Sequence, residues 1–199
     1  MAIIVVGGSG RGAGKTALVC GLIRALHEIP WTAVKITSHV YGQPAPLWEE
    51  TQAGQETDTA RYLAAGARRA LLVTAGDEAL GPIVQRILAD CPPPAGAIFE
   101  SNRVLRHLRP DLCLAAASSL RGEHKPSFDL VEQHMDAMVE LAGHDHVVER
   151  ERLAFRLVSL ERVSPTMLEW LRERLDERQG IATPSSKDRS MGTPAGSSQ

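Results

Sequence analysis

The segment Gly7-Gly8-Ser9-Gly10-Arg11-Gly12-Ala13-Gly14-Lys15-Thr16 stands between two apolar runs, residues 2–6 and 17–26. An apolar strand that leads through glycines into a helix is the layout of a phosphate-binding loop. Glycines let backbone N–H groups turn toward an anion, Lys15 adds a positive charge for the β- and γ-phosphates, and the Thr16 hydroxyl is a ligand for Mg²⁺. This layout predicts a site for Mg²⁺ and a nucleoside triphosphate, either ATP or GTP.

The spacing of this phosphate loop, residues 8–16, differs by one residue from the common pattern Gly-x4-Gly-Lys-Thr, which would place a glycine at Ser9. Either Ser9 replaces that glycine, or the loop begins at Gly8 and is one residue longer; the remaining glycines allow both. A glycine-rich turn that binds nothing is the alternative to a phosphate site. The residues expected to bind the nucleotide are Gly8, Ser9, Gly10, Arg11, Gly12, Ala13, Gly14, Lys15, Thr16, Ala17 and Lys35.

The composition argues against several classes of protein. The chain has 199 residues and a formal net charge of −2, without the basic excess that drives non-specific binding to nucleic acid. Its cysteines, Cys20, Cys91 and Cys113, are far apart and lie in or beside apolar runs, as reduced core thiols do. No apolar run approaches the roughly 20 residues of a membrane span, and no basic segment precedes the first run. We expect a cytoplasmic protein with no nucleic-acid or membrane partner.

Strands and helices alternate along the chain, which predicts an α/β, three-layer fold of the P-loop NTPase type, with a mostly parallel sheet and helices on both faces. Segment 40–57 is predicted to be a long loop. Residues 1–177 are predicted to form one nucleotide-binding domain, and 178–199 a disordered tail. The predicted strands are 2–6, 32–36, 70–74, 97–100, 112–116 and 155–160, and the predicted helices are 16–26, 58–65, 77–88, 128–141 and 165–175, the last with Ser164 as its N-cap.

Ligands of such sheets bind where the parallel strands end, so the residues that follow three of the strands are expected to converge: the phosphate loop, 35–39 and 100–103. Glu100, after an apolar run, is predicted to bind Mg²⁺ or polarise a water; the alternative is an ordinary acid at a strand end. Asp58 is either a second ligand of the metal or of water, or a helix cap. With Lys15, these two acids are the predicted catalytic residues, and Thr16, Glu100 and Asp58 are the predicted metal ligands.

Lys35 lies in an otherwise apolar strand, so we expect its charge to emerge at the strand end. There it would receive a triphosphate or, with Arg103, a small acidic co-substrate; the alternative is a side chain that lies along the sheet with its ammonium in water. Ser38 and His39 are candidate phosphate or substrate contacts, or idle surface residues. The run His144-Asp145-His146 is more typical of a surface than of a metal site.

Together these residues resemble the SIMIBI class of phosphate-loop proteins, and most closely the adaptor protein B family (MobB-like) of molybdopterin-guanine dinucleotide biosynthesis. Val34-Lys35-Ile36-Thr37-Ser38-His39 is similar to the Lys-His-x-His-His segment of that family. Thr57-Asp58-Thr59-Ala60-Arg61 and Ala65-Gly66-Ala67 resemble the next helix, and Phe99-Glu100-Ser101 resembles a strand that ends in Glu-Gly. The resemblance covers about residues 2–116 in the same order. It implies a GTP-binding accessory protein that acts beside a pterin-type cofactor, and dimers are common in these families.

The sequence also departs from that family. Ile36 and Ser38 replace histidines, Ser101 replaces the glycine after the acid, and the longer phosphate loop looks more like that of dethiobiotin synthetase, an ATP-dependent carboxylating enzyme. The guanine-recognition pattern Asn-Lys-x-Asp is absent from residues 115–122, so the base stays undetermined. Three functions therefore remain open: an accessory NTPase or GTP-binding adaptor, an ATP-dependent ligase or kinase that acts on a small acid, and a nucleotide-dependent regulatory switch.

Overall fold

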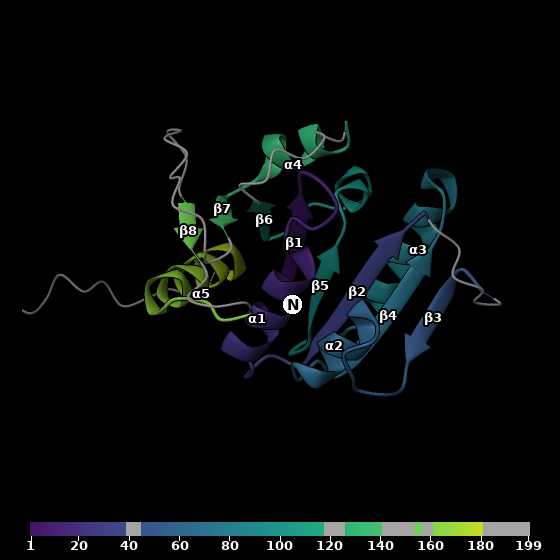
Figure 1. Cartoon of the computed structure of the whole chain (residues 1–199), viewed down its shortest axis with the longest axis horizontal. Helices are drawn as coiled ribbons and strands as arrows, with labels where there is room; N and C mark the ends of the chain where they lie inside the picture. Colours follow the sequence, from purple (N-terminus) through teal and green to yellow (C-terminus); the bar gives the residue numbers. More distant parts are fainter. Residues whose placement is uncertain (39–44, 118–125, 141–153, 157–160, 181–199) are drawn as a thin grey trace, which may run out of the picture.

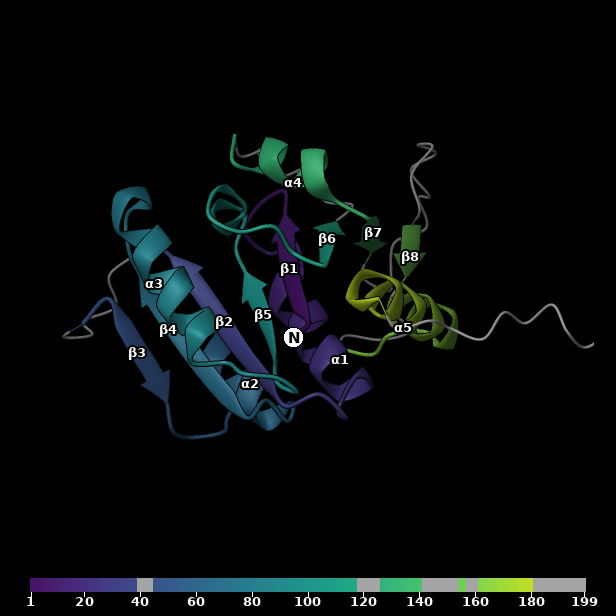
Figure 2. The same cartoon turned by 180° about the vertical axis from the view of Figure 1, so that it is seen from behind.

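The computed structural model describes residues 1–38, 45–117, 126–140, 154–156 and 161–180. In this part of the chain, one twisted sheet has helices on both faces (Figures 1 and 2). The strands are β1 (Ile3–Gly8), β2 (Trp31–Thr37), β3 (Leu47–Glu50), β4 (Arg69–Thr74), β5 (Gly96–Glu100), β6 (Leu112–Ala117), β7 (Ala137–Glu140) and β8 (Ala154–Arg156). The helices are α1 (Lys15–Ala25), α2 (Asp58–Ala64), α3 (Asp77–Ala89), α4 (Phe128–His134), α5 (Pro165–Gln179) and the 3-10 helix η1 (Arg103–Arg106).

The strand order across the sheet is β3-β4-β2-β5-β1-β6-β7-β8, and every neighbouring pair is parallel except β3 with β4. The central strands β1 and β5 read IIVVGG and GAIFE. Such continuous apolar runs are typical of strands that are buried on both faces by crossover helices. The predicted fold class, an α/β fold with a mostly parallel sheet and helices on both faces, is therefore confirmed.

Alternation along β1 divides the core into two layers. Ile4 and Val6 pack with α1, α2 and α5 on one face of the sheet, whereas Val5 packs with α3, η1 and α4 on the other. The three cysteines lie in these layers as free thiols, and burial raises the pKa of Cys20 and of Cys113 to about 12. The expectation of reduced core thiols agrees with this placement.

Two short strands were not predicted. β3 lies inside segment 40–57, expected to be a loop, and it pairs antiparallel with β4 at the sheet edge, where Glu49 accepts two hydrogen bonds from Arg69. β7 occupies the second half of the predicted helix 128–141, because α4 ends at His134 and the Asp136 carboxylate accepts a hydrogen bond from Cys113 N at 2.8 Å. That bond directs residues 137–140 alongside β6.

The C-terminal elements differ from their predicted bounds. Of the predicted strand 155–160, residues 155 and 156 belong to β8, and 157–160 lie outside the described residues. Helix α5 has Ser164 as its N-cap, as predicted, and it continues to Gln179, where Gly180 follows in the left-handed conformation. The first two residues of the predicted tail therefore belong to this helix. None of the helices in the described ranges is long and apolar enough to cross a membrane.

Candidate functional site

The carboxyl ends of β1, β2 and β5 meet at one edge of the sheet and border a cavity of about 300 Å³. The register explains the meeting, because Val6 of β1 and Lys35 of β2 are both directly beside Glu100 of β5. The cavity is lined by Gly8, Gly10 and Lys15 of the phosphate loop, by residues 35–38 and 100–103, and by Ser127. The three segments predicted to converge thus do so, while His39 lies outside the described residues.

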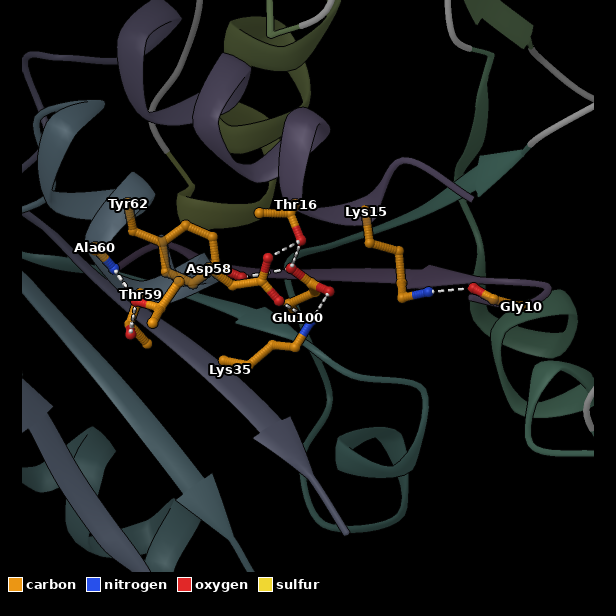
Figure 3. A network of polar contacts seen from close by, with 10 residues as sticks. Gly10, Lys15, Thr16, Lys35, Asp58, Thr59, Ala60, Tyr62 and Glu100 are labelled. Atoms are coloured by element: carbon orange, nitrogen blue, oxygen red, sulfur yellow. Dashed lines mark hydrogen bonds and ion pairs between the residues drawn. The ribbon is translucent and has the colours of Figure 1, made fainter. Parts of the chain in front are cut away.

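The phosphate loop turns where its glycines take backbone angles that other residues avoid. Gly12 and Gly14 have φ angles of 76° and 86°, and Gly14 is the N-cap of α1. Since glycine has no side chain to cap the helix, it leaves the amides of the first turn of α1 open to an anion. Lys15 folds back over the loop, and its ammonium donates to the Gly10 carbonyl at 2.6 Å (Figure 3).

The other residues of the loop differ in exposure. Ser9 is half-buried, whereas Arg11 is exposed to solvent together with Gly12. Ala13, within the loop, and Ala17, directly after it, are buried. The loop therefore presents its backbone and Lys15, rather than Arg11, to the cavity.

Five side chains form a second group, which we call the carboxylate cluster: Thr16, Lys35, Asp58, Tyr62 and Glu100 (Figure 3). The Thr16 hydroxyl lies 2.9 Å from Asp58 Oδ1 and 2.8 Å from Glu100 Oε2. The Lys35 ammonium pairs with Asp58 Oδ2 at 2.7 Å and with Glu100 Oε1. The Tyr62 hydroxyl donates to Glu100 Oε2. The cluster thus places both predicted acids against Thr16, and it binds Lys35 between them.

Helix α2 contributes two members of the cluster through its local structure. Its N-cap is Thr57, whose hydroxyl accepts a hydrogen bond from Ala60 N at 3.0 Å, so Asp58 does not cap the helix. The Asp58 carboxylate is instead directed to Thr16 and Lys35. Tyr62 lies four residues after Asp58 on the same face of the helix, and it was not predicted from the sequence. The spacing of four residues from Asp58 could have indicated that Tyr62 also faces the site.

The charges of the cluster shift the pKa values of its members. Burial disfavours the ammonium of Lys35, but the Glu100 charge and hydrogen bonds to Asp58 and Glu100 outweigh it and raise the pKa of Lys35. Burial likewise opposes ionisation of Asp58, yet the hydrogen bond and charge of Lys35 lower the pKa of Asp58. Burial, and then the charge of Glu100, raise the pKa of Tyr62 far above its ordinary value. Tyr62 is therefore a phenol that donates to Glu100.

Asn102 lies in the predicted segment 100–103, but its own role was not predicted: it fixes the start of the phosphate loop. Its Oδ1 accepts a hydrogen bond from Gly8 N at 2.9 Å, and its Nδ2 donates to the Gly8 carbonyl at 3.0 Å and to Ser127 Oγ at 3.3 Å. This side-chain amide pairs with the backbone as a neighbouring strand would. It joins the residues after β5 to the end of β1.

Two predicted cationic residues line the cavity and have partners within the protein. Lys35 emerges at the end of β2, as expected, and its ammonium pairs with the carboxylates of Asp58 and Glu100. Arg103 lines the cavity, but its guanidinium binds Asp77 Oδ1 at 2.7 Å and the Ala75 carbonyl at 2.9 Å. Ser38 lines the cavity. The run 144–146 lies outside the described residues.

The oxygens of the cluster suit Mg²⁺. Adjacent ligands of an octahedral Mg²⁺ ion, with bonds of about 2.0–2.1 Å, are about 2.9 Å apart. The Thr16 oxygen has this spacing from both Asp58 and Glu100. The spacing suits a hydrogen bond equally well, but the Thr16 hydroxyl has one hydrogen and donates to one carboxylate at a time. A cation would interact with all three oxygens together.

Within the described ranges, no group of three or more His, Cys, Asp and Glu side chains is placed to hold a metal ion. Two carboxylates and a hydroxyl are nevertheless a typical set of protein ligands for Mg²⁺, because phosphates and waters supply the remaining ligands. The residues therefore fit a magnesium–phosphate complex better than a metal held by protein side chains alone.

Comparison with known proteins supports the fold. No protein-family model matches the chain, and no curated protein matches it. Among solved structures, the chain is similar to LpxK from Aquifex aeolicus, in an "apo" form in complex with ATP, with 17% identity and a TM-score of 0.50. The match covers 98% of this chain and 75% of the LpxK chain. At this identity, the likeness shows a shared fold.

Proposed function

We propose that the chain binds a magnesium–nucleoside triphosphate in the cavity and promotes cleavage of its terminal phosphate, as an accessory NTPase or adaptor similar to those of molybdenum cofactor biosynthesis. The observation that carries the proposal is that Lys15 and Glu100 line the same cavity, and that Thr16, the last residue of the phosphate loop, contacts both Glu100 and Asp58. An anion site and a cation site in contact suit a triphosphate with its metal.

The residues have separate roles in this proposal. Backbone N–H groups of the phosphate loop bind the β- and γ-phosphates, and Lys15 turns from the Gly10 carbonyl to neutralise the charge that develops on them. Thr16, Asp58 and Glu100 would hold Mg²⁺. When bound, Mg²⁺ would polarise the phosphate oxygens and offset their charge. The carboxylate of Asp58 is also placed to orient a water, since it is the more exposed of the two acids.

ATP is the first nucleotide to test, because the structural neighbour was solved in complex with ATP and the guanine-recognition pattern is absent from residues 115–122. Calorimetry of the purified protein with ATP and with GTP, each with and without Mg²⁺, measures base preference and metal dependence together. We expect Mg²⁺-dependent binding of one nucleotide, and loss of that binding in Lys15→Ala. If neither nucleotide binds under any condition, the proposal is wrong.

A second function is favoured by other residues that line the cavity. Besides the phosphate loop, the lining includes the hydroxyl residues Thr37, Ser38 and Ser127, and the side chain of Arg103, whose guanidinium also binds Asp77. These residues suit a small acidic acceptor, as in an ATP-dependent ligase or kinase. Phosphate release without an added acceptor supports the accessory NTPase, whereas release that needs a small acid supports the ligase or kinase.

A further inference from the structure

The Lys35 ammonium lies where the two acids of the carboxylate cluster face each other. It contacts Oδ2 of Asp58 and Oε1 of Glu100, while Thr16 contacts the other oxygen of each carboxylate. Figure 3 shows the lysine reaching the acids from β2, across from the threonine on α1. Every carboxylate oxygen of the pair therefore has a partner within the protein.

This arrangement lets the protein keep two acids close together without an external cation. The Glu100 side chain is 1% exposed, so its charge is cut off from water and needs a partner. Two carboxylates that share one hydroxyl also repel each other. Lys35 offsets one of the two negative charges, and the raised pKa of Lys35 and lowered pKa of Asp58 reflect the same pairing.

We infer that Lys35 is a built-in competitor of the divalent cation. Its ammonium pairs with Oδ2 of Asp58 and Oε1 of Glu100, the same two carboxylates whose Oδ1 and Oε2 would hold the cation beside Thr16. Both cations neutralise the same two negative charges at close range and repel each other, so binding of the divalent ion weakens the pairing of Lys35 and drives its ammonium away. The inference rests on the proposed function for the identity of the cation, Mg²⁺. A divalent ion in place of the ammonium changes the net charge of the two acids and their cation from −1 to zero. The displaced Lys35, whose side chain lines the cavity, then adds its charge to that of Lys15.

The exchange couples the metal to the triphosphate. Without a triphosphate, the metal must displace Lys35 and leave an ammonium in the cavity beside Lys15, so we expect it to bind weakly. With a triphosphate present, the displaced ammonium gains an anionic partner and the same exchange becomes favourable. Lys35 would thereby make the site accept the metal and the nucleotide together rather than the metal alone.

The test is made without nucleotide, on the full chain, with Mg²⁺ alone as the probe. In Lys35→Met the two acids lack their cation, and we expect Mg²⁺ to bind at least tenfold more tightly than to the wild type by calorimetry. Saturating Mg²⁺ should raise the melting temperature of this variant by about 5–10 °C and that of the wild type by much less. Equal Mg²⁺ affinity in the two proteins would overturn the inference.

Arg103→Met is the matched control. It removes one positive charge from the lining of the same cavity, but Arg103 contacts Asp77 and Ala75 and no member of the carboxylate cluster. If its Mg²⁺ affinity rises as much as that of Lys35→Met, the effect is one of general charge, and direct competition is wrong. An affinity close to that of the wild type supports competition.

Lys35→Met itself folds poorly if the repulsion between the acids is strong enough. The same comparison then uses refolding from urea with Mg²⁺ or with a chelator: recovery only with Mg²⁺ supports the inference. The double variant Lys35→Met, Asp58→Asn removes the repulsion, so it should fold without Mg²⁺ and lose the response to it. A Lys35→Met protein that refolds equally, or fails equally, with and without Mg²⁺ contradicts the inference.

Failure of the proposed function gives a different result. If ATP and GTP do not bind but Lys35→Met gains Mg²⁺ affinity, the competition stands and the nucleotide assignment is wrong. If a nucleotide binds to the wild type but Lys35→Met shows no gain in Mg²⁺ affinity, the nucleotide assignment stands and the competition is wrong. In the wild type, a nucleotide that binds should increase the Mg²⁺ affinity. In Lys35→Met, adding the same nucleotide should increase the Mg²⁺ affinity much less.

Discussion

The phosphate loop and the carboxylate cluster meet at Thr16, yet they are built in opposite ways. The loop is one continuous segment whose polar groups are mostly backbone amides, with Arg11 and Gly12 in solvent. The cluster joins side chains from α1, β2, α2 and β5, and two of them, Tyr62 and Glu100, are buried. Local backbone geometry shapes the loop, whereas long-range packing shapes the cluster. Substitutions in the loop should therefore change binding, and substitutions in the cluster should change stability as well.

The largest effect is expected for Glu100→Ala. The change leaves the Lys35 ammonium with one acid and removes the acceptor of the buried Tyr62 hydroxyl. Loss of one partner from a buried charged network costs about 3–5 kcal/mol in the free energy of unfolding. Urea denaturation of the two proteins measures it. A loss below about 1 kcal/mol would show that the cluster does not stabilise the fold. Glu100→Gln, which keeps the shape, should fold better and still lose Mg²⁺-dependent turnover.

Lys15→Ala should give the contrasting result. Its ammonium donates to the Gly10 carbonyl within the half-buried loop, so its loss should lower the melting temperature by only about 1–6 °C, which corresponds to the roughly 0.5–1.5 kcal/mol of one hydrogen bond. Nucleotide affinity should fall by about 100-fold, because a charged hydrogen bond to phosphate is lost. Calorimetry and thermal unfolding of the same sample separate the two quantities. Unchanged nucleotide affinity would remove Lys15 from the site.

Tyr62→Phe makes a smaller change in the cluster. Phenylalanine fills nearly the same buried space, but Glu100 Oε2 loses the donor that holds it toward Thr16. We expect a loss of about 1–3 kcal/mol in the free energy of unfolding, the usual range for a hydrogen bond to a charged group. Mg²⁺ affinity in the presence of nucleotide should fall several-fold, because the carboxylate is then less well oriented. A stability loss without any change in Mg²⁺ affinity would limit Tyr62 to a role in packing.

The same contrast explains what the sequence could predict. The phosphate loop is contiguous, so its residue types and spacing were enough to locate it. Glu100 was predicted because acids at strand ends meet at one edge of a parallel sheet. The contacts of Tyr62 with Glu100 and of Asn102 with Gly8 were not predicted, because the partners are far apart in the sequence and meet only through strand register and helix placement.

The secondary structure shows the same division between local and long-range signals. The long amphipathic or buried elements were predicted, while the short strands β3 and β7 were not. Among the residues that the structure describes, β3 has one neighbour in the sheet, and β7 has a sequence, AMVE, that is compatible with a helix. The pairing of β7 with β6 selected the strand. The secondary-structure propensity of the four residues of β7 carries no information about a partner strand such as β6.

The smallest effect should appear in the pH dependence of stability, because the Asp58 side chain is 35% exposed and solvent weakens its pairing. Its folded pKa is lowered from 3.8, so the stability that ionised Asp58 contributes is present above about pH 4 and is lost as the pH falls through the folded value. The pKa of Lys35 is raised from 10.5, so its contribution is complete below that pH and is lost as the pH rises through the folded value.

Between these two pH limits, the difference in stability between the wild type and Asp58→Asn should be constant. Thermal unfolding of both proteins from pH 2.5 to 9 measures it. We expect the wild type to melt higher across the neutral range and the two curves to approach each other as the pH falls below about 4 toward the lowered pKa of Asp58, because the wild type then loses the Asp58 charge. A difference in melting temperature that does not shrink between pH 4 and pH 2.5 would mean that the substitution acts through packing, and that the link between Asp58 and Lys35 does not distinguish the cluster from the phosphate loop.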